Sequence, residues 1–157
     1  TCHSYSDDNT TRLHYYKSAE VRCCEGVFYY RICHASVTHQ PTLRRFDWMR
    51  ANESMKRHLQ RLGVDERIMR KWETCRMMIL VDCYMFYHCH HRKFPPSDRR
   101  YALGELHRVW QDIDRRLLDP AKTRKPGYRP MPRWWLFRLQ EWAYFTLRGL
   151  LGRNRKD

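Results

Sequence analysis

The residues best suited to metal chemistry lie in one short run, His88-Cys89-His90-His91, which follows Cys83 closely in the chain. Imidazole nitrogens and thiolates are ligands that Zn²⁺ prefers, so the run raises the question of a metal site. Consecutive residues on a helix project about 100° apart, however, so four neighbouring ligands cannot converge on one ion. We interpret the run as the polar end of a helix and expect no directly bound cofactor. A site formed by Cys83, Cys89 and one histidine stays as the alternative.

Catalytic motifs are not recognisable in the sequence, which has no Gly-rich phosphate loop, no nucleophile elbow and no HExxH. Asp112 and Asp114 could form an acid pair, but residues two apart face different directions on a helix. Because Arg115 and Arg116 follow them directly, we interpret both carboxylates as solvated charges. We therefore expect a protein without enzymatic activity.

The chain is strongly basic, with 31 Lys and Arg against 17 Asp and Glu in 157 residues, a net charge of +14. Its length suits one domain, and its charge suits an acidic partner such as RNA, anionic lipid or an acidic protein. Acids alternate with the basic residues in DERIMRKWE and GELHRVWQDIDRR, which favours solvated helix faces there. Only the C-terminal third is almost entirely basic, so we expect the partner at that end.

The sequence contains few features that indicate the cellular compartment of the protein. The seven cysteines are an odd number with irregular spacing, which favours reduced thiols over a disulfide framework. The longest apolar run, from Met77, is too short to cross a bilayer. The sequence begins at Thr1 without a methionine, which is compatible with removal of a basic leader on mitochondrial import.

Apolar residues recur at three- and four-residue steps and no segment alternates as a strand would, so we predict an all-α protein. Thr42 and Asp65 are predicted to cap the second and third helices, and Gly63 to end the second. A fourth helix is predicted from Ser97 or Asp98, with its apolar stripe reaching Leu117. The predicted regions are an N-terminal arm (1–17), a helical bundle (18–118) whose first three helices span 18–37, 42–62 and 65–87, a Pro-rich extended basic strap (119–133), and an aromatic amphipathic helix with a basic tail (134–157).

The last helix is rich in aromatic residues that could dock on a surface. The candidate docking residues are Trp134, Trp135, Phe137, Trp142 and Phe145. Such a helix fits a membrane surface or a groove on a neighbouring protein equally well, and both interpretations stay open. RNA is a less favoured partner, which the strap with Tyr128, Trp134 and Trp135 could grip by phosphate contact and stacking.

Three stretches resemble the LYR-motif family of mitochondrial three-helix proteins. They are Tyr29-Tyr30-Arg31, the basic residues Arg44, Arg45 and Arg50, and MKRHLQRLGVD from Met55. The spacing is most similar to that of an LYR accessory subunit in the membrane arm of respiratory complex I, which YMFYHCHHRKFPP and RPMPRWW also resemble. The resemblance covers residues 20–96. Two positions depart from the family pattern, since Tyr29 replaces a leucine and Leu59 replaces an aromatic residue.

This resemblance implies a partner, the mitochondrial acyl carrier protein, whose acylated phosphopantetheine arm would enter the bundle between the helices. It places Tyr30 at the mouth of that tunnel and Arg31 against the phosphate and carboxylates of the carrier. Further contacts with the acidic carrier would come from Arg44, Arg45, Lys56 and Arg61. Without a carrier, Arg31 would simply extend its charge from the end of the bundle into water.

The function implied by the resemblance is that of a non-catalytic accessory subunit of a mitochondrial respiratory-chain assembly, with complex I the nearest. Its neighbours would be other subunits, and it would lie peripherally on the matrix side of the inner membrane. The alternative is a mitochondrial ribosomal or RNA-associated structural protein, for which the basic charge is the support.

Overall fold

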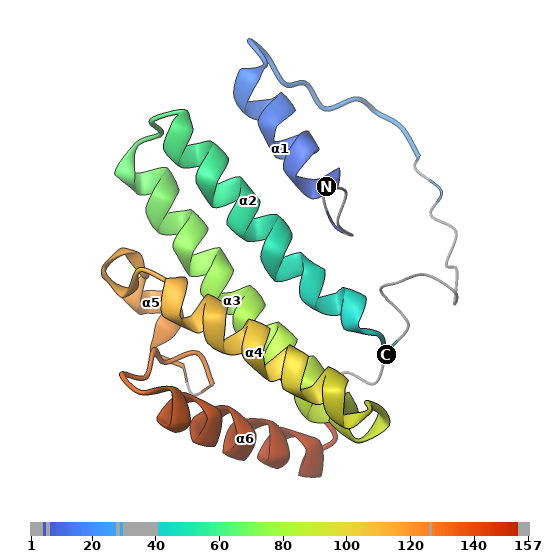
Figure 1. Ribbon diagram of the computed structural model, residues 1–157. Coiled ribbons are helices and arrows are strands. Elements are labelled where there is room, and N and C mark those ends of the chain that lie inside the picture. Colours follow the sequence, from blue (N-terminus) through green and yellow to red (C-terminus); the bar gives the residue numbers. More distant parts are fainter. Residues whose placement is uncertain (1–4, 6, 28, 30–40, 126, 154–157) are drawn as a thin grey trace.

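The computed structural model describes residues 5, 7–27, 29, 41–125 and 127–153, and it folds them into helices joined by turns (Figure 1). Helices are the only regular secondary structure among these residues, which confirms the all-α prediction. The elements are α1 (Asp7–Lys17), η1 (Leu43–Phe46), α2 (Asp47–Arg61), α3 (Glu66–His90), η2 (His91–Lys93), α4 (Pro96–Asp112), η3 (Arg115–Leu117), α5 (Pro120–Thr123) and α6 (Trp134–Leu150).

The long helix α3 lies at the centre of the fold and contacts α2, α4 and α6 (Figure 1). The turn from α2 to α3 is short because of two local signals that the sequence predicts. Gly63 follows the end of α2 with a φ of +61°, a backbone conformation that is energetically unfavourable for a residue with a Cβ. The Asp65 carboxylate then caps α3 by accepting a hydrogen bond of 2.8 Å from the Ile68 amide. Thr42 does precede η1, but its hydroxyl makes no capping hydrogen bond.

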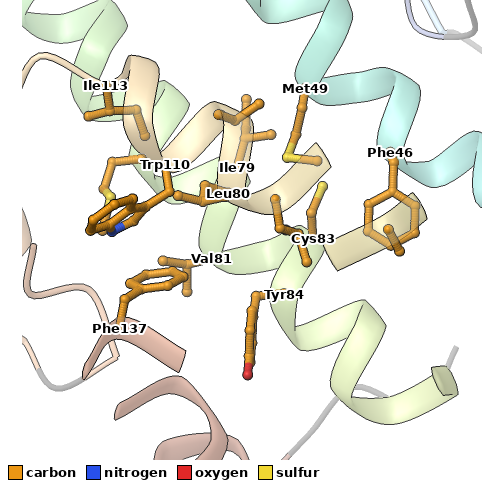
Figure 2. Packing of buried hydrophobic residues seen from close by; sticks show 14 of the residues in the cluster. Phe46, Met49, Ile79, Leu80, Val81, Cys83, Tyr84, Trp110, Ile113 and Phe137 are labelled. Carbon is orange, nitrogen blue, oxygen red and sulfur yellow. The ribbon is translucent and has the colours of Figure 1, made fainter. Parts of the chain in front are cut away.

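The main hydrophobic core forms where α2, α3, α4 and α6 meet (Figure 2). Leu80 and Val81 of α3 are completely buried at its centre, with Met49 of α2 and Phe137 of α6 packed in the same cluster. A second, smaller core of Met55, Leu59 and Trp72 lies between α2 and α3. Burial of apolar side chains on three sides of α3 is the main favourable term for the fold.

The prediction for the N-terminal region was wrong. Residues 18–27 are not helical, and the rest of the predicted first helix, apart from Tyr29, lies outside the described residues. The helix instead occupies the predicted arm, as α1, where Asp7 and Asp8 in its first turn and Lys17 in its last suit the helix dipole. Polar contacts attach it to the bundle. The Asn9 amide donates to the Ala51 carbonyl at 2.7 Å, and the Arg12 guanidinium lies 5.1 Å from the Trp72 ring.

The fourth helix also differs from its prediction. It begins at Pro96 and ends at Asp112, whereas the apolar stripe predicts a helix reaching Leu117. Asp114 explains the early end. Its carboxylate accepts a hydrogen bond from the Arg116 amide and opens η3, in place of the backbone bond that this amide would make in a continuing helix. Asp119 then accepts one from the Ala121 amide and opens α5.

The basic strap is packed, although the sequence predicts it to be extended. It contains the single turn of α5, and Tyr128 and Met131 pack against the main core. Gly127 has a φ of +84°, and a Cβ built on it would lie 2.4 Å from the Tyr144 ring of α6. Only glycine fits this close approach. The strap thus holds α6 against the bundle.

Candidate docking surface

The C-terminal helix α6 has an inner face that fixes it to α3. Phe137, Glu141 and Phe145 recur at four-residue steps and are all buried. The Tyr84 ring of α3 meets Phe137 edge to face at 5.8 Å between centroids, and its hydroxyl donates to the Arg138 carbonyl at 3.2 Å. These contacts set the rotation of α6 about its own axis, so they also decide which side chains point to solvent.

The outer face of α6 is formed by Trp135, Leu139, Trp142 and Leu150. The first three leave 57%, 56% and 56% of their surface exposed, and Leu150 leaves 80%. Trp135, Leu139 and Trp142 recur at steps of four and three residues, so they form one continuous stripe. With Arg138 and Tyr84 they line a shallow pocket on the surface. Large apolar side chains gathered in this way are typical of binding surfaces.

The exposed charges on and around α6 are all positive. Glu141 is the only acidic residue between Pro120 and Arg153, and it is completely buried on the inner face. Burial raises the pKa of its carboxyl to about 8, against which a hydrogen bond from the Gln140 amide acts in the opposite direction. The group is therefore protonated at neutral pH. The surface of this region carries only positive charge, with Arg133, Arg138 and Arg153 exposed.

The structure places the predicted docking residues in three different environments. Trp135 and Trp142 are exposed on the outer face. Phe137 and Phe145 are buried core residues that pack against α3. The prediction that they dock on a partner was therefore wrong. Trp134 is half-buried, where its ring stacks on His107 at 4.8 Å. Sequence reasoning missed Leu139 and Leu150, although their helical spacing from Trp135 would have placed them on the same face.

The residues predicted to meet an acyl carrier protein do not share one environment. Tyr30 and Arg31 lie outside the described residues. Arg44 and Arg61 are exposed, at opposite ends of the segment formed by η1 and α2. Two other cations have partners within the chain: Arg45 lies 5.0 Å from the Trp48 ring, and the half-buried Lys56 belongs to an ion-pair network.

That network joins α2, α3 and the end of α4 through four charges. Glu73 and Arg76 of α3 have almost no exposed surface and form an ion pair of 3.0 Å. Lys56 Nζ of α2 lies 2.7 Å from Glu73, and Arg76 Nη2 lies 2.6 Å from Asp112. Burial opposes ionisation of Asp112, but hydrogen bonds from Arg76 and Lys56 hold its pKa below the ordinary value. Asp112 is therefore a structural partner, which corrects its interpretation as a solvated charge.

A second set of ion pairs connects α2 to α4. Arg50 binds Glu105 through two hydrogen bonds of 3.0 Å, and Arg108 bridges Glu105 and Glu53 at 3.2 and 2.7 Å. Burial acts to raise the pKa of Glu105, and the two arginines lower it further than burial raises it. Many of the interleaved charges thus hold helices together, where the sequence had indicated solvated faces.

The histidine and cysteine run lies at the end of α3. Cys83 is buried, and burial raises the pKa of its thiol to about 12, so it is a neutral core residue. Cys89 is exposed, and the ring of His88 lies 6.2 Å from that of Phe145. Among the residues that the structure describes, no group of three or more histidine, cysteine or acidic side chains is placed to hold a metal ion.

Comparison of the chain with known protein families, with curated proteins and with solved structures found no match.

The buried ion pair predicts an unequal effect of two similar substitutions. Arg76→Met leaves Glu73 in the protein interior with Lys56 as its remaining partner, and we expect a loss of about 3–5 kcal/mol in the free energy of unfolding. The matched control is Arg70→Met, which removes an exposed pair with Glu66 of the same helix and should cost at most about 0.5 kcal/mol. Urea unfolding followed by circular dichroism measures both, and equal small losses would contradict the assigned role of the network.

The protonated carboxyl of Glu141 predicts a pH-dependent stability. Its pKa is about 8 in the folded chain and about 4.5 when exposed, so the folded state binds the proton more tightly. The stability from this group is complete below the lower pKa and is lost as pH rises to about 8, by at most roughly 1.4 kcal/mol per pH unit.

The test compares Glu141→Gln with the wild-type chain by urea unfolding at several pH values. The variant keeps the shape of the side chain and removes its titration, so the difference in unfolding free energy should move in favour of the variant as pH rises. A difference that stays constant over this range would show that Glu141 does not titrate in the folded chain.

Proposed function

We propose that this protein is a non-catalytic accessory subunit of a larger assembly and that it joins the assembly through the outer face of α6. The main support for this proposal is the exposed stripe of Trp135, Leu139 and Trp142. Tryptophan is enriched in binding surfaces because it brings a large apolar area with few rotatable bonds. Keeping such residues in water has no benefit for the isolated chain.

The packing of α6 against the rest of the fold supports this proposal. Its inner face is held by buried Phe137 and Phe145, and the strap closes on it where Gly127 meets the Tyr144 ring. A helix held on two sides presents its outer face in a fixed geometry, so a partner does not have to order it on binding. The buried charges of the bundle serve contacts between helices, which suits a scaffold for docking.

The more specific expectation, an LYR-type subunit of a mitochondrial respiratory-chain assembly that binds an acyl carrier protein, stays a prediction from the resemblance. Arg44 and Arg61 are the described candidates that are free to meet an acidic carrier, because Lys56 is held by Glu73 and Asp112. Its three-helix arrangement would need a helix near Tyr30, whereas the neighbouring residues 18–27 are not helical.

Native mass spectrometry of the chain co-expressed with a mitochondrial acyl carrier protein tests this prediction. We expect a one-to-one complex that carries a long-chain acyl group. It should be lost in Arg31→Glu and weakened in the double variant Arg44→Glu with Arg61→Glu, since both changes place like charges opposite the acidic carrier. Arg116→Glu, at an exposed arginine of η3, is the control. No complex with the wild-type chain would mean that the resemblance does not extend to function.

RNA binding is less well supported than docking. Of the three aromatic residues considered for stacking on bases, Tyr128 packs against the core, Trp134 stacks on His107, and only Trp135 is largely exposed. Single-stranded nucleic acid needs several accessible rings along a basic groove.

The docking role is tested by the size of the native particle in the cells that express this protein. We expect the wild-type chain to migrate in a high-mass assembly on native gels of mildly solubilised extracts. The double variant Trp135→Lys with Leu139→Lys should migrate as the free chain, because two charges on the stripe oppose its burial.

The matched control is Tyr15→Lys with Tyr16→Lys. These tyrosines are exposed on α1, which lies on the opposite side of the molecule from α6 (Figure 1). The control should stay in the assembly, and both variants should keep the thermal unfolding midpoint of the wild-type chain. If the wild-type chain migrates alone, or if both variants are released equally, α6 is not the docking surface.

A further inference from the structure

The outer face of α6 is suited to one particular kind of surface. The helix has 17 residues and is therefore about 25 Å long, and none of the described helices is both long and apolar enough to cross a bilayer. Its two faces are distinct, because Phe137 and Glu141 face α3 and the exposed Trp135 and Trp142 face solvent. A helix of this kind can bind only with its axis parallel to the surface that it meets.

Charge distinguishes the possible surfaces. Arg133 precedes α6, Arg153 follows it and Arg138 borders the pocket beside Trp135 and Trp142. No exposed acid balances them between Pro120 and Arg153, since Glu141 is buried. A complementary surface must therefore supply negative charge at both ends of the helix and beside its apolar stripe. The phosphates and carboxylates of an anionic bilayer are distributed over its whole area in this way.

We propose that α6 binds the surface of an anionic lipid bilayer, lying flat with Trp135, Leu139 and Trp142 inserted among the headgroups and with Arg133, Arg138 and Arg153 on the phosphates. This inference rests on the proposed function: it takes the assembly to be bound to a membrane and names the bilayer of that membrane as the surface that the outer face of α6 meets. Indole rings prefer the boundary between headgroups and hydrocarbon, and arginine side chains beside them can reach the phosphates.

The position of Arg138 favours a bilayer over a groove on another protein. Its side chain borders the same pocket as three apolar residues of the stripe, so a closely fitted protein groove would remove its charge from water. Such a groove would have to supply a carboxylate beside Arg138, because a buried guanidinium without one is strongly unfavourable. At a bilayer the same residue remains hydrated and in contact with phosphate while its neighbours insert.

Co-sedimentation of the full-length chain with vesicles tests the proposal. One set of vesicles is phosphatidylcholine alone, and the other contains phosphatidylcholine with phosphatidylserine. We expect binding to the anionic vesicles at least about tenfold tighter than to the neutral ones, and weaker binding as salt is added. Quenching of tryptophan fluorescence by brominated lipid should report insertion of the stripe.

Two variants separate the apolar and the electrostatic contributions. Trp135→Ala with Trp142→Ala should weaken binding to anionic vesicles at least about tenfold and abolish most of the quenching. Arg133→Gln with Arg153→Gln should weaken binding to anionic vesicles and leave the weak binding to neutral ones unchanged. Tyr15→Ala with Tyr16→Ala on α1 is the control and should bind as the wild-type chain does. All these side chains are exposed, and an unchanged thermal midpoint confirms folding.

The outcomes distinguish this inference from the proposed function. Loss of anionic binding in both α6 variants, with the α1 control unaffected, supports the bilayer. If the wild-type chain binds no vesicles, yet the α6 stripe is needed for its high-mass assembly, the partner is a protein surface: the bilayer proposal is overturned and the docking role stands. Equal binding to neutral and anionic vesicles, or equal loss in the α1 control, also overturns it.

Discussion

Glu73 and Arg76 lie one turn apart on α3, and water reaches almost none of either side chain. An isolated charge in that position would cost several kcal/mol, so each residue requires the other. Lys56 from α2 and Asp112 from the end of α4 add a further partner to each of them. Because these partners come from different helices, the pair accepts only one arrangement of α2 and α4 around α3. The hydrophobic core supplies most of the driving force, and this network restricts how it can be assembled.

The opposite flank of α3 is organised mainly by aromatic packing. There Tyr84 and Phe137 meet edge to face, and the α6 carboxyl of Glu141 is buried in its protonated form. The strap then packs across α6, with Gly127 against Tyr144. One flank of the molecule therefore uses ion pairs and the other uses aromatic packing. This division explains how a chain with so many basic residues can still carry an apolar stripe on a firmly held helix.

The sequence was a good guide wherever the signal was local. Asp65 and Gly63 define the turn between α2 and α3, and the aromatic run from Trp134 marks α6, as predicted. The sequence was a poor guide where contacts between distant residues determine the position of a helix or the burial of a side chain. The polar segment of α1 has no apolar period, and its place depends on Asn9 reaching a carbonyl of α2, which no local pattern reveals. Likewise, burial of Glu73 follows from the approach of three helices, so its spacing alone resembled that of any solvated helix face.

The protonation of Glu141 couples folding to the pH and the buffer of the solution. Between the exposed and buried pKa values of this carboxyl, the unfolded chain carries an anion and the folded chain carries a neutral acid. Docking of α6 on α3 therefore takes up a proton at neutral pH, and the surrounding buffer must release it. The measured enthalpy of unfolding will then contain the ionisation enthalpy of the buffer. Calorimetry in buffers with different ionisation enthalpies would measure the net number of protons taken up, to which Glu141 contributes uptake and His88, whose pKa is lowered by burial, contributes release.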